Sequence, residues 1–151
     1  MKRSKIVQAL PGHRWNGVVV SAYKADGSRH RDIARQTLVG DQEDDTSGAV
    51  LRYFEIQPDG YSSLERHQHE HVVVVLCGRG EVILGDSVEA LAPNDCVYVA
   101  PDTFHQFHAT AGVPLGFLCL VDRVRDRPVA PTTADIEILA RNPQVARLMK
   151  V

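Results

Sequence analysis

Short runs of strand-forming residues occupy the chain from about residue 17 to residue 121, and turn-forming residues such as Pro58, Asp59 and Gly60 separate them. No stretch between the runs has the length and the 3.6-residue period of an amphipathic helix. Many short strands at close spacing are typical of a sandwich or a closed barrel, so we expect an all-β domain. The runs rich in Val, Ile, Leu, Tyr and Phe cover residues 18–23, 33–39, 50–56, 72–76, 81–84, 96–99, 104–108 and 115–121.

One of these runs differs from the others because it is apolar at every position. Residues 72–76 read Val-Val-Val-Val-Leu. Alternating apolar and polar residues indicate a strand with one solvated face, whereas a continuous apolar run indicates a strand that is covered on both faces. We therefore expect this strand to be buried from both sides.

The apolar period changes near the end of the chain, after Pro128 and Pro131. From there the apolar residues lie at helical spacing in two groups, and the pair Asn142-Pro143 separates the groups. We expect one or two short helices that pack on the barrel or on a partner subunit. The chain is thus divided into an N-terminal arm (1–16), a barrel (17–127) and a helical tail (128–151). The apolar residues of the tail are Ile136, Leu139, Ala140, Val145, Leu148 and Met149.

Size and charge restrict the functions that the chain can have. With 151 residues and 44% hydrophobic side chains, it is long enough for one sizeable core. A formal net charge of -2 gives no electrostatic reason to expect nucleic acid or an anionic membrane as a partner. The three cysteines are widely spaced in apolar stretches, which predicts buried free thiols in a reducing compartment. We expect a cytoplasmic protein. These cysteines are Cys77, Cys96 and Cys119.

A cluster of histidines is the strongest candidate for a functional site. Residues 67–71 read His-Gln-His-Glu-His, Glu65 precedes them, and His105 lies in a later strand-like run. Imidazole and carboxylate groups together suit divalent first-row metals. The alternative interpretation of residues 67–71 is a polar strand or turn that faces solvent.

Strand geometry restricts how these histidines could share one ion. On a straight strand His67 and His71 would lie roughly 13 Å apart, too far to bind one metal at ~2 Å. The chain must therefore reverse between them, which puts His69 near the tip of the turn. Glu65 and His67 are two residues apart and face the same side of their strand. The candidate ligands are thus Glu65, His67 and His71, with a distant residue as the fourth.

His105 is the best candidate for the fourth ligand. It shares a strand face with Phe107, so that one coordinating and one apolar side chain point in the same direction. His108 falls on the opposite face, where we expect a surface histidine.

The spacing around these residues resembles the first motif of the cupin superfamily, G(x)5HxH(x)3,4E(x)6G. Six residues separate Gly78 from His71, three separate His71 from His67, and Glu65 lies two positions earlier. Gly60 opens the segment one residue closer than the general pattern requires. In this alignment Glu65 takes the first His position and His71 takes the Glu position.

The second cupin motif, G(x)5PxG(x)2H(x)3N, resembles the segment that leads to His105. Pro93, Asn94 and Asp95 are similar to the usual Pro-Gly-Asp turn, and residues 100–105 match the approach to the fourth ligand. Asn tolerates the left-handed backbone conformation nearly as well as Gly does. The departures from the motif are Asn94, Ala100, Asp102 and Ala109, which replace Gly, Pro, Gly and Asn.

The resemblance leaves a second alignment of the ligands open. His67 and His69 could be the literal HxH pair, but only Glu70 then separates His69 from His71, which is too few residues to reverse direction. We favour the set Glu65, His67, His71 and His105, and we keep a set that includes His69 as the alternative.

The resemblance implies a double-stranded β-helix, the cupin or jelly-roll barrel, with a metal inside its mouth. We expect Mn, Fe or Ni, with Zn or Cu as alternatives. The family is chemically diverse, so the fold does not specify the reaction. We expect a metal-dependent enzyme that acts on a small oxygen-bearing molecule, with dioxygenase-like oxidation favoured over isomerase or lyase chemistry. The alternative is a non-catalytic cupin that binds or senses a small molecule. The resemblance and the edge strands also favour a homodimer.

Overall fold

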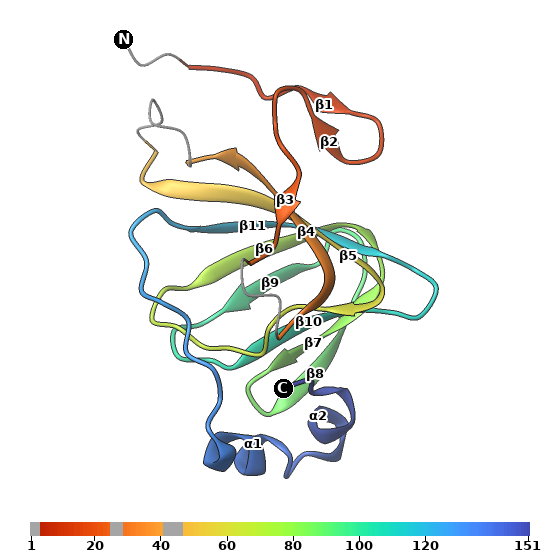
Figure 1. Ribbon diagram of the computed structural model, residues 1–151, viewed down its shortest axis with the longest axis vertical. Helices are drawn as coiled ribbons and strands as arrows, with labels where there is room; N and C mark the ends of the chain where they lie inside the picture. Colours follow the sequence, from red (N-terminus) through yellow and green to blue (C-terminus); the bar gives the residue numbers. More distant parts are fainter. Residues whose placement is uncertain (1–3, 25–28, 41–46) are drawn as a thin grey trace.

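The computed structural model describes residues 4–24, 29–40 and 47–151, and within them the chain is predominantly β-structure. The architecture confirms the expected all-β barrel with a short helical segment at its C-terminal end (Figure 1). In chain order the strands are β1 (Ala9–Leu10), β2 (Arg14–Trp15), β3 (Ser21–Ala22), β4 (Arg31–Val39), β5 (Ala49–Tyr61), β6 (His71–Gly78), β7 (Gly80–Leu84), β8 (Ser87–Leu91), β9 (Cys96–Val99), β10 (His105–Ala109) and β11 (Leu115–Asp122).

The main sheet is antiparallel throughout and curls on itself. Its strand order is β8-β7-β10-β5-β11-β6-β9, with β4 also paired to β5 and β3 paired to β4. The short β1-β2 hairpin forms a separate sheet. It lies at the opposite end of the molecule from the helices (Figure 1).

β5 is longer than expected because residues 58–60 bend the strand and do not end it. Asp59 has a left-handed backbone (φ 63°), and a Cβ on Gly60 would lie only 2.7 Å from the carbonyl oxygen of Arg31. Glycine permits this close approach of two backbones. The strand continues to Tyr61, which pairs with His108 of β10. The prediction of a turn at residues 58–60 was therefore wrong.

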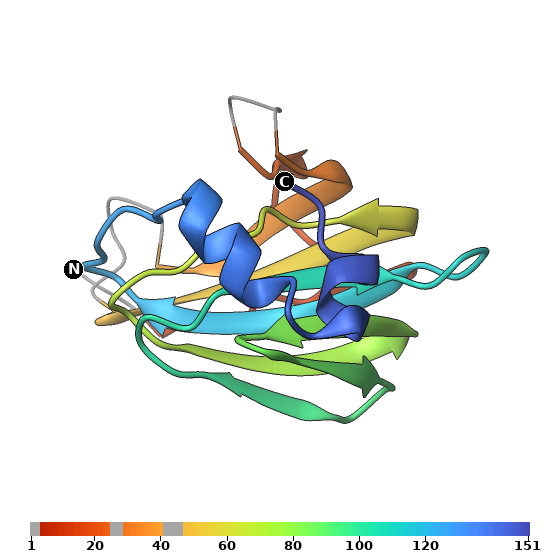
Figure 2. The same ribbon diagram turned by 90° about the horizontal axis from the view of Figure 1, so that it is seen from below.

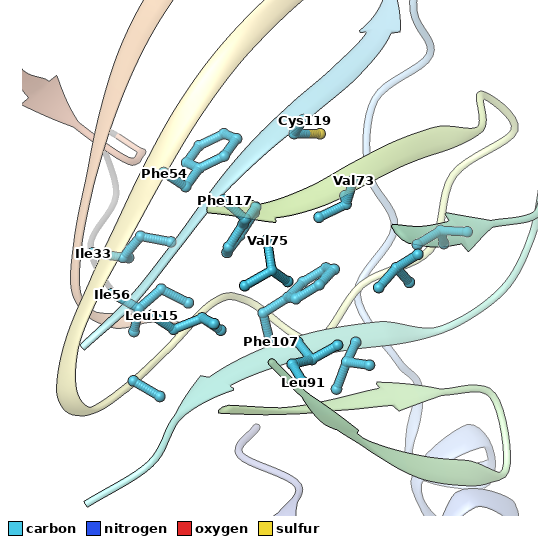
Figure 3. Close-up of a cluster of buried hydrophobic side chains, with 14 of the residues drawn as sticks. Ile33, Phe54, Ile56, Val73, Val75, Leu91, Phe107, Leu115, Phe117 and Cys119 are labelled. Carbon is cyan, nitrogen blue, oxygen red and sulfur yellow. The ribbon is translucent and has the colours of Figure 1, made fainter. Parts of the chain in front are cut away.

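The core lies between the two halves of the curled sheet (Figure 3). Three phenylalanines form its centre: the ring centroids of Phe107 and Phe117 are 4.7 Å apart, and those of Phe54 and Phe117 are 5.6 Å apart. Burying one such side chain contributes about 1.5–3 kcal/mol to stability. The core also includes Ile33, Val50, Ile56, Val73, Val75, Val82, Leu91, Val97, Val99, Ala109, Leu115, Cys119 and Val121.

β6 is buried on one face only, although its sequence is apolar at almost every position. Val73 and Val75 are fully buried, whereas Val72 on the opposite face is 37% exposed. The expectation of a strand covered on both sides was wrong. The outward residues of β6 lie beside β9 and β11, whose own outward residues Tyr98 and Leu120 are also exposed.

In contrast to β6, β10 is buried on both faces, since all five of its residues are buried. The end of the chain covers its outer face. The Gln106 side-chain amide donates to the carbonyl oxygens of Ser62 and Lys150, and its side-chain oxygen accepts from the Lys150 backbone amide. The ring of His108 forms a hydrogen bond with the same Gln106 oxygen. His108 is therefore buried, and the expectation of a surface histidine was wrong.

Two short helices follow β11, and each begins at a capping residue. α1 (Thr133–Leu139) starts with a capping box between Thr132 and Asp135. α2 (Pro143–Leu148) is capped by Asn142, with proline at its first position. Neither helix is long and apolar enough to cross a membrane.

The helices pack against the outside of the barrel (Figure 2). Their buried residues form a second hydrophobic cluster with residues of the segment before β6, of β7 and of the loop before β10. This packing explains why β10 is covered on both faces. The cluster consists of Leu64, Ile83, Phe104, Leu139, Val145 and Leu148.

Candidate metal centre

The fold brings four histidines and one glutamate together at one place in the barrel. His71 is the first residue of β6, and His105 is the first residue of β10. Glu65 is fixed beside His105 by two backbone hydrogen bonds, His105 N to Glu65 O (3.0 Å) and Glu65 N to His105 O (3.3 Å). All four residues in the favoured ligand set, and His69 as well, therefore lie in one cluster.

The distances within this cluster are short enough for shared ligation. The ring centroid of His67 lies 4.4 Å from that of His71 and 4.9 Å from that of His105. The potential ligand atoms of Glu65, His67 and His105 lie within 4.8 Å of one another. Those of His67, His69 and His71 meet the same limit. Two overlapping groups thus share His67.

Hydrogen bonds to Asp126 stabilise the reversal of the chain between His67 and His71. Its carboxylate accepts the backbone amides of Gln68 (2.8 Å) and His69 (3.0 Å), together with Nδ1 of His69 (2.6 Å). These hydrogen bonds hold the pKa of Asp126 well below its usual range, so it remains a carboxylate. The sequence analysis missed this residue because its contacts are made across more than fifty residues of chain.

The hydrogen bonds of the rings leave their Nε2 atoms available for an ion. Nδ1 of His67 bonds to the carbonyl oxygen of His69 (2.6 Å), and Nδ1 of His105 bonds to that of Thr103 (2.9 Å). A carbonyl oxygen can only accept, so Nδ1 carries the proton and Nε2 carries the lone pair. This is the arrangement in which proteins orient metal-binding histidines.

Two ring nitrogen atoms of the cluster have no partner among the residues that the structure describes. Nε2 of His67 and Nε2 of His71 are buried and have no hydrogen-bond partner. Leaving a buried polar atom unpaired costs about 1–3 kcal/mol, and coordination to a metal ion removes that cost. The donor set therefore fits a divalent metal.

The electrostatic environment keeps the imidazoles neutral, which is the form that binds metals. Burial lowers the pKa of His105 to about 4. Burial also lowers the pKa of His71, and the neighbouring His105 and His67 lower it further. At neutral pH these rings therefore hold no extra proton that a metal would have to displace.

The structure also bears on the choice between Glu65 and His69. The rings of His67 and His69 are stacked, with centroids 3.7 Å apart and planes inclined by only 9°. The lone pair of an imidazole lies in the ring plane, so this pair is less suited to one ion than His67 and His71, whose rings are also stacked but lie 4.4 Å apart with planes inclined by 27°. Glu65 is buried and forms an ion pair with Lys24. We retain Glu65, His67, His71 and His105 as the proposed ligands.

A cavity of about 360 Å³ opens from the cluster into the barrel. Aromatic residues Tyr23, Phe54, Phe107 and Phe117 form part of its wall. Phe107 thus lies where its shared face with His105 predicts. The rest of the lining is strongly basic, although the whole chain carries a formal charge of -2. Six basic side chains line the cavity, namely Lys24, Arg35, Arg52, Arg123, Arg125 and Arg127.

The sequence analysis missed the basic lining, although a signal for it exists. Arg35 and Arg52 occupy inward positions of strands whose other inward residues are apolar, such as Ile33 and Phe54. An arginine that interrupts an apolar face is energetically unfavourable and therefore indicates a binding role. Assigning the inward face requires the register, which the sequence leaves unresolved.

Comparison with known proteins assigns the family. A family model for the cupin domain matches residues 52–121. A Rhodospirillum rubrum protein named 1-methylthio-D-xylulose 5-phosphate methylsulfurylase is 45% identical over 138 residues, which cover 91% of this chain and 86% of the relative. The chain belongs to the cupin superfamily. The histidine cluster and the basic cavity thus lie in a cupin barrel.

Solved cupin structures share the fold over nearly the full chain. A cupin-2 domain from Rhodospirillum rubrum is 44% identical, with a TM-score of 0.81 and 88% of each chain covered. A cupin 2 conserved barrel protein from Rhodopseudomonas palustris is 38% identical, with a TM-score of 0.87. That match covers 98% of this cupin and 100% of the other chain. The likeness therefore includes the C-terminal helices.

The proposed ligand set predicts how much metal two variants of the protein bind. We expect Glu65→Ala to lower metal affinity by at least about 10-fold, because it removes a ligand from the shared site. We expect His69→Ala to retain stoichiometric metal. The measurement is elemental analysis together with metal titration of each purified variant, and circular dichroism provides the check on folding. The opposite pattern would replace Glu65 with His69 in the set.

The lowered histidine pKa values predict how the stability of the metal-free protein depends on pH. His105 and His108 both have a folded-state pKa of about 4, against an ordinary 6.5. Between pH 4 and pH 6.5 these two histidines are protonated in the unfolded chain and neutral in the folded chain. The stabilisation is therefore complete above pH 6.5 and is lost as the pH falls toward 4, by about 1.4 kcal/mol per pH unit for each histidine.

Urea unfolding of the metal-free protein at several pH values measures this slope. His108→Gln removes one titrating ring outside the metal cluster and retains a group that can bond to Gln106. We expect this variant to have a shallower slope than the wild type. A free energy of unfolding that stays constant from pH 6.5 to 4.5 would contradict the burial of neutral rings.

Proposed function

We propose that this cupin is a metal-dependent enzyme that transfers the methylthio group of a methylthio-substituted keto-sugar phosphate to a small thiol. The C–S bond of the substrate breaks and a C–H bond replaces it, with the hydrogen supplied by the thiol. The methylthio group leaves as a mixed disulfide with the thiol sulfur. One observation carries the proposal: neutral imidazoles with unpartnered Nε2 atoms open into a cavity lined by six basic residues. Such a cavity suits a small anionic molecule that also offers oxygen atoms to a metal. The 45% identical relative, named for 1-methylthio-D-xylulose 5-phosphate, supports this substrate class.

Glu65, His67, His71 and His105 are the residues that would hold the metal. Four protein ligands leave one or two positions open on an octahedral ion, so Mn, Fe or Ni suits the set, and Zn or Cu is also compatible with it. A divalent ion bound there would polarise the oxygens of a bound substrate.

The remaining cavity residues bind and enclose the substrate. Phe54, Phe107 and Phe117 present apolar surface that excludes water from the carbon chain. Burial raises the pKa of Tyr23 above its ordinary value, so its hydroxyl remains protonated and can donate a hydrogen bond to a substrate oxygen. The basic residues attract the phosphate from solution.

The decisive test is the product formed from 1-methylthio-D-xylulose 5-phosphate. We expect protein loaded with Mn, Fe, Ni or Zn to yield a sugar phosphate that lacks the methylthio group, as detected by mass spectrometry with and without a small thiol. We expect His71→Ala and His105→Ala to lower the rate by at least about 100-fold, because each removes a ligand of the ion. Arg147→Gln, on the outer surface, is the matched control.

Two other outcomes would assign a different function. Oxygen consumption with the methylthio group retained would indicate dioxygenase-type oxidation. A ligand-induced thermal shift without turnover would indicate a binding or sensing cupin.

We also propose that the chain forms a homodimer through the outer face of β11, β6 and β9. Leu120 pairs with Val72, which pairs with Tyr98, so the three side chains form one row across the sheet. They are 42%, 37% and 56% exposed, respectively. A row of exposed apolar side chains on a sheet face is typical of a subunit interface.

A charge within this row is expected to prevent the association. Sedimentation should show a dimer for the wild type and a monomer for Val72→Arg, because the arginine would be buried without a partner. Val124→Arg is the control, since Val124 is 91% exposed and lies outside the row. A monomeric wild type, or a dimeric Val72→Arg protein, would contradict this interface.

A further inference from the structure

Two arginines on the inner face of the barrel lie next to each other across neighbouring strands. Arg35 of β4 pairs with Phe54 of β5, and Thr37 of β4 pairs with Arg52 of β5. Arg35 and Arg52 are therefore diagonal neighbours, whose backbones lie about 7–8 Å apart. Both line the cavity that contains the histidine cluster. Two guanidinium groups at this spacing can bind the same anion from two sides.

Neither arginine has an acidic partner in the part of the chain that the structure describes. The Nε atoms of Arg35 and Arg52 are buried and have no hydrogen-bond partner. Arg52 donates to the sulfur of Cys119 (3.6 Å), which is a weak acceptor, and lies over the ring of Phe54 (5.1 Å). Both residues are half-buried, and a half-buried cation without a counter-charge is unfavourable unless a ligand supplies that charge.

Other arginines of this cupin form ion pairs with carboxylates. Arg14 forms an ion pair with Glu55 (3.5 Å), and Arg147 forms one with Glu81 (3.1 Å). These pairs lie outside the cavity. The missing counter-charge at Arg35 and Arg52 is therefore a property of the cavity and not of arginines throughout the chain.

The two acidic residues that line the cavity already have partners other than Arg35 and Arg52. Glu65 pairs with Lys24, and Asp126 binds the reversal at Gln68 and His69. A metal at the histidine cluster would add further positive charge. Among the residues that the structure describes, no carboxylate remains to balance Arg35 and Arg52, and an anionic ligand would supply this charge.

The register also gives the distance from the arginines to the histidine cluster. Arg52 pairs with Cys119 of β11, which pairs with Val73 of β6, and His71 is the next inward residue on β6. Two strand spacings separate β5 from β6, about 10 Å in total. Arg52 therefore lies two strands away from the strand that carries His71.

We infer that Arg35 and Arg52 form a phosphate-binding subsite on the wall of the cavity that β4 and β5 provide. This inference rests on the proposed function for the identity of the phosphate donor. Paired guanidinium groups favour phosphate because each presents a planar fork of donors to its tetrahedrally arranged oxygens. A carboxylate, which has only two oxygens, satisfies fewer of these donors.

Binding of inorganic phosphate to the metal-free protein tests the subsite directly. We expect calorimetry to show binding to the wild type and to Arg147→Gln, and at least about 10-fold weaker binding to Arg35→Gln and Arg52→Gln. We expect Arg52→Lys to restore only part of the affinity, because an ammonium group cannot provide the planar fork. Equal affinity in all variants, or equally tight binding of acetate by the wild type, would overturn the phosphate assignment.

Thermal unfolding separates a binding role from a structural one. Without phosphate, we expect Arg52→Gln to melt at the same temperature as the wild type or higher, because it removes an uncompensated half-buried charge. With phosphate, only the wild type and Arg147→Gln should gain melting temperature. A variant that melts lower without phosphate, and that phosphate still stabilises as much as it does the wild type, would show that Arg52 is structural.

Kinetics distinguish failure of the subsite from failure of the proposed function. We expect Arg35→Gln and Arg52→Gln to raise KM for the phosphorylated substrate by about 10–100-fold, with metal content unchanged. For the dephosphorylated analogue, wild type and variants should have the same high KM. Equal KM for both substrates in the wild type would overturn the subsite and leave the reaction intact. Phosphate binding without turnover of either substrate would preserve the subsite and refute the reaction.

Discussion

β5 pairs with β4 and β11 along its first part and with β10 at its end, so both halves of the barrel depend on this one strand. The bend at Asp59 and Gly60 makes the double pairing possible. Because β5 changes partners there, β10 faces β6 across the cavity, and His105 comes within reach of His71. The same strand presents Arg52 and Phe54 to the interior. The histidine cluster and the basic wall therefore both depend on this bend in β5.

Much of this arrangement can be predicted from local sequence, because strand-forming runs and turn residues are local signals. β9 has the predicted bounds, 96–99, and the expected reversal between His67 and His71 is present in the structure. Long-range contacts decide the features that were missed. β8 (Ser87–Leu91) alternates polar and apolar residues over only four positions, which is a weak local signal, and it is held in place by its pairing with β7. The covering of β10 depends on Lys150 at the far end of the chain.

The cavity differs from the rest of the fold in how its buried polar atoms are bonded. Elsewhere most buried side chains are apolar or, as at Gln106, fully bonded, and the exceptions are single atoms of Gln36 and His30. In the cavity, the imidazoles of His67 and His71 and the guanidinium groups of Arg35 and Arg52 have buried nitrogen atoms without partners. Such local conflicts concentrate at functional sites, where a ligand provides the missing interactions. Ion and anion are therefore expected to stabilise the fold as they bind.

Burial affects imidazole and guanidinium groups differently, and this difference gives the two groups different functions. An imidazole responds to burial by losing its proton, as the lowered pKa of His105 shows, and it then offers a lone pair. A guanidinium cannot lose its proton in a protein and remains a cation. Burial in one cavity thus produces a neutral electron-pair donor at His71 and leaves a fixed positive charge at Arg52. A molecule that satisfies both must carry neutral oxygens at one end and an anionic group at the other.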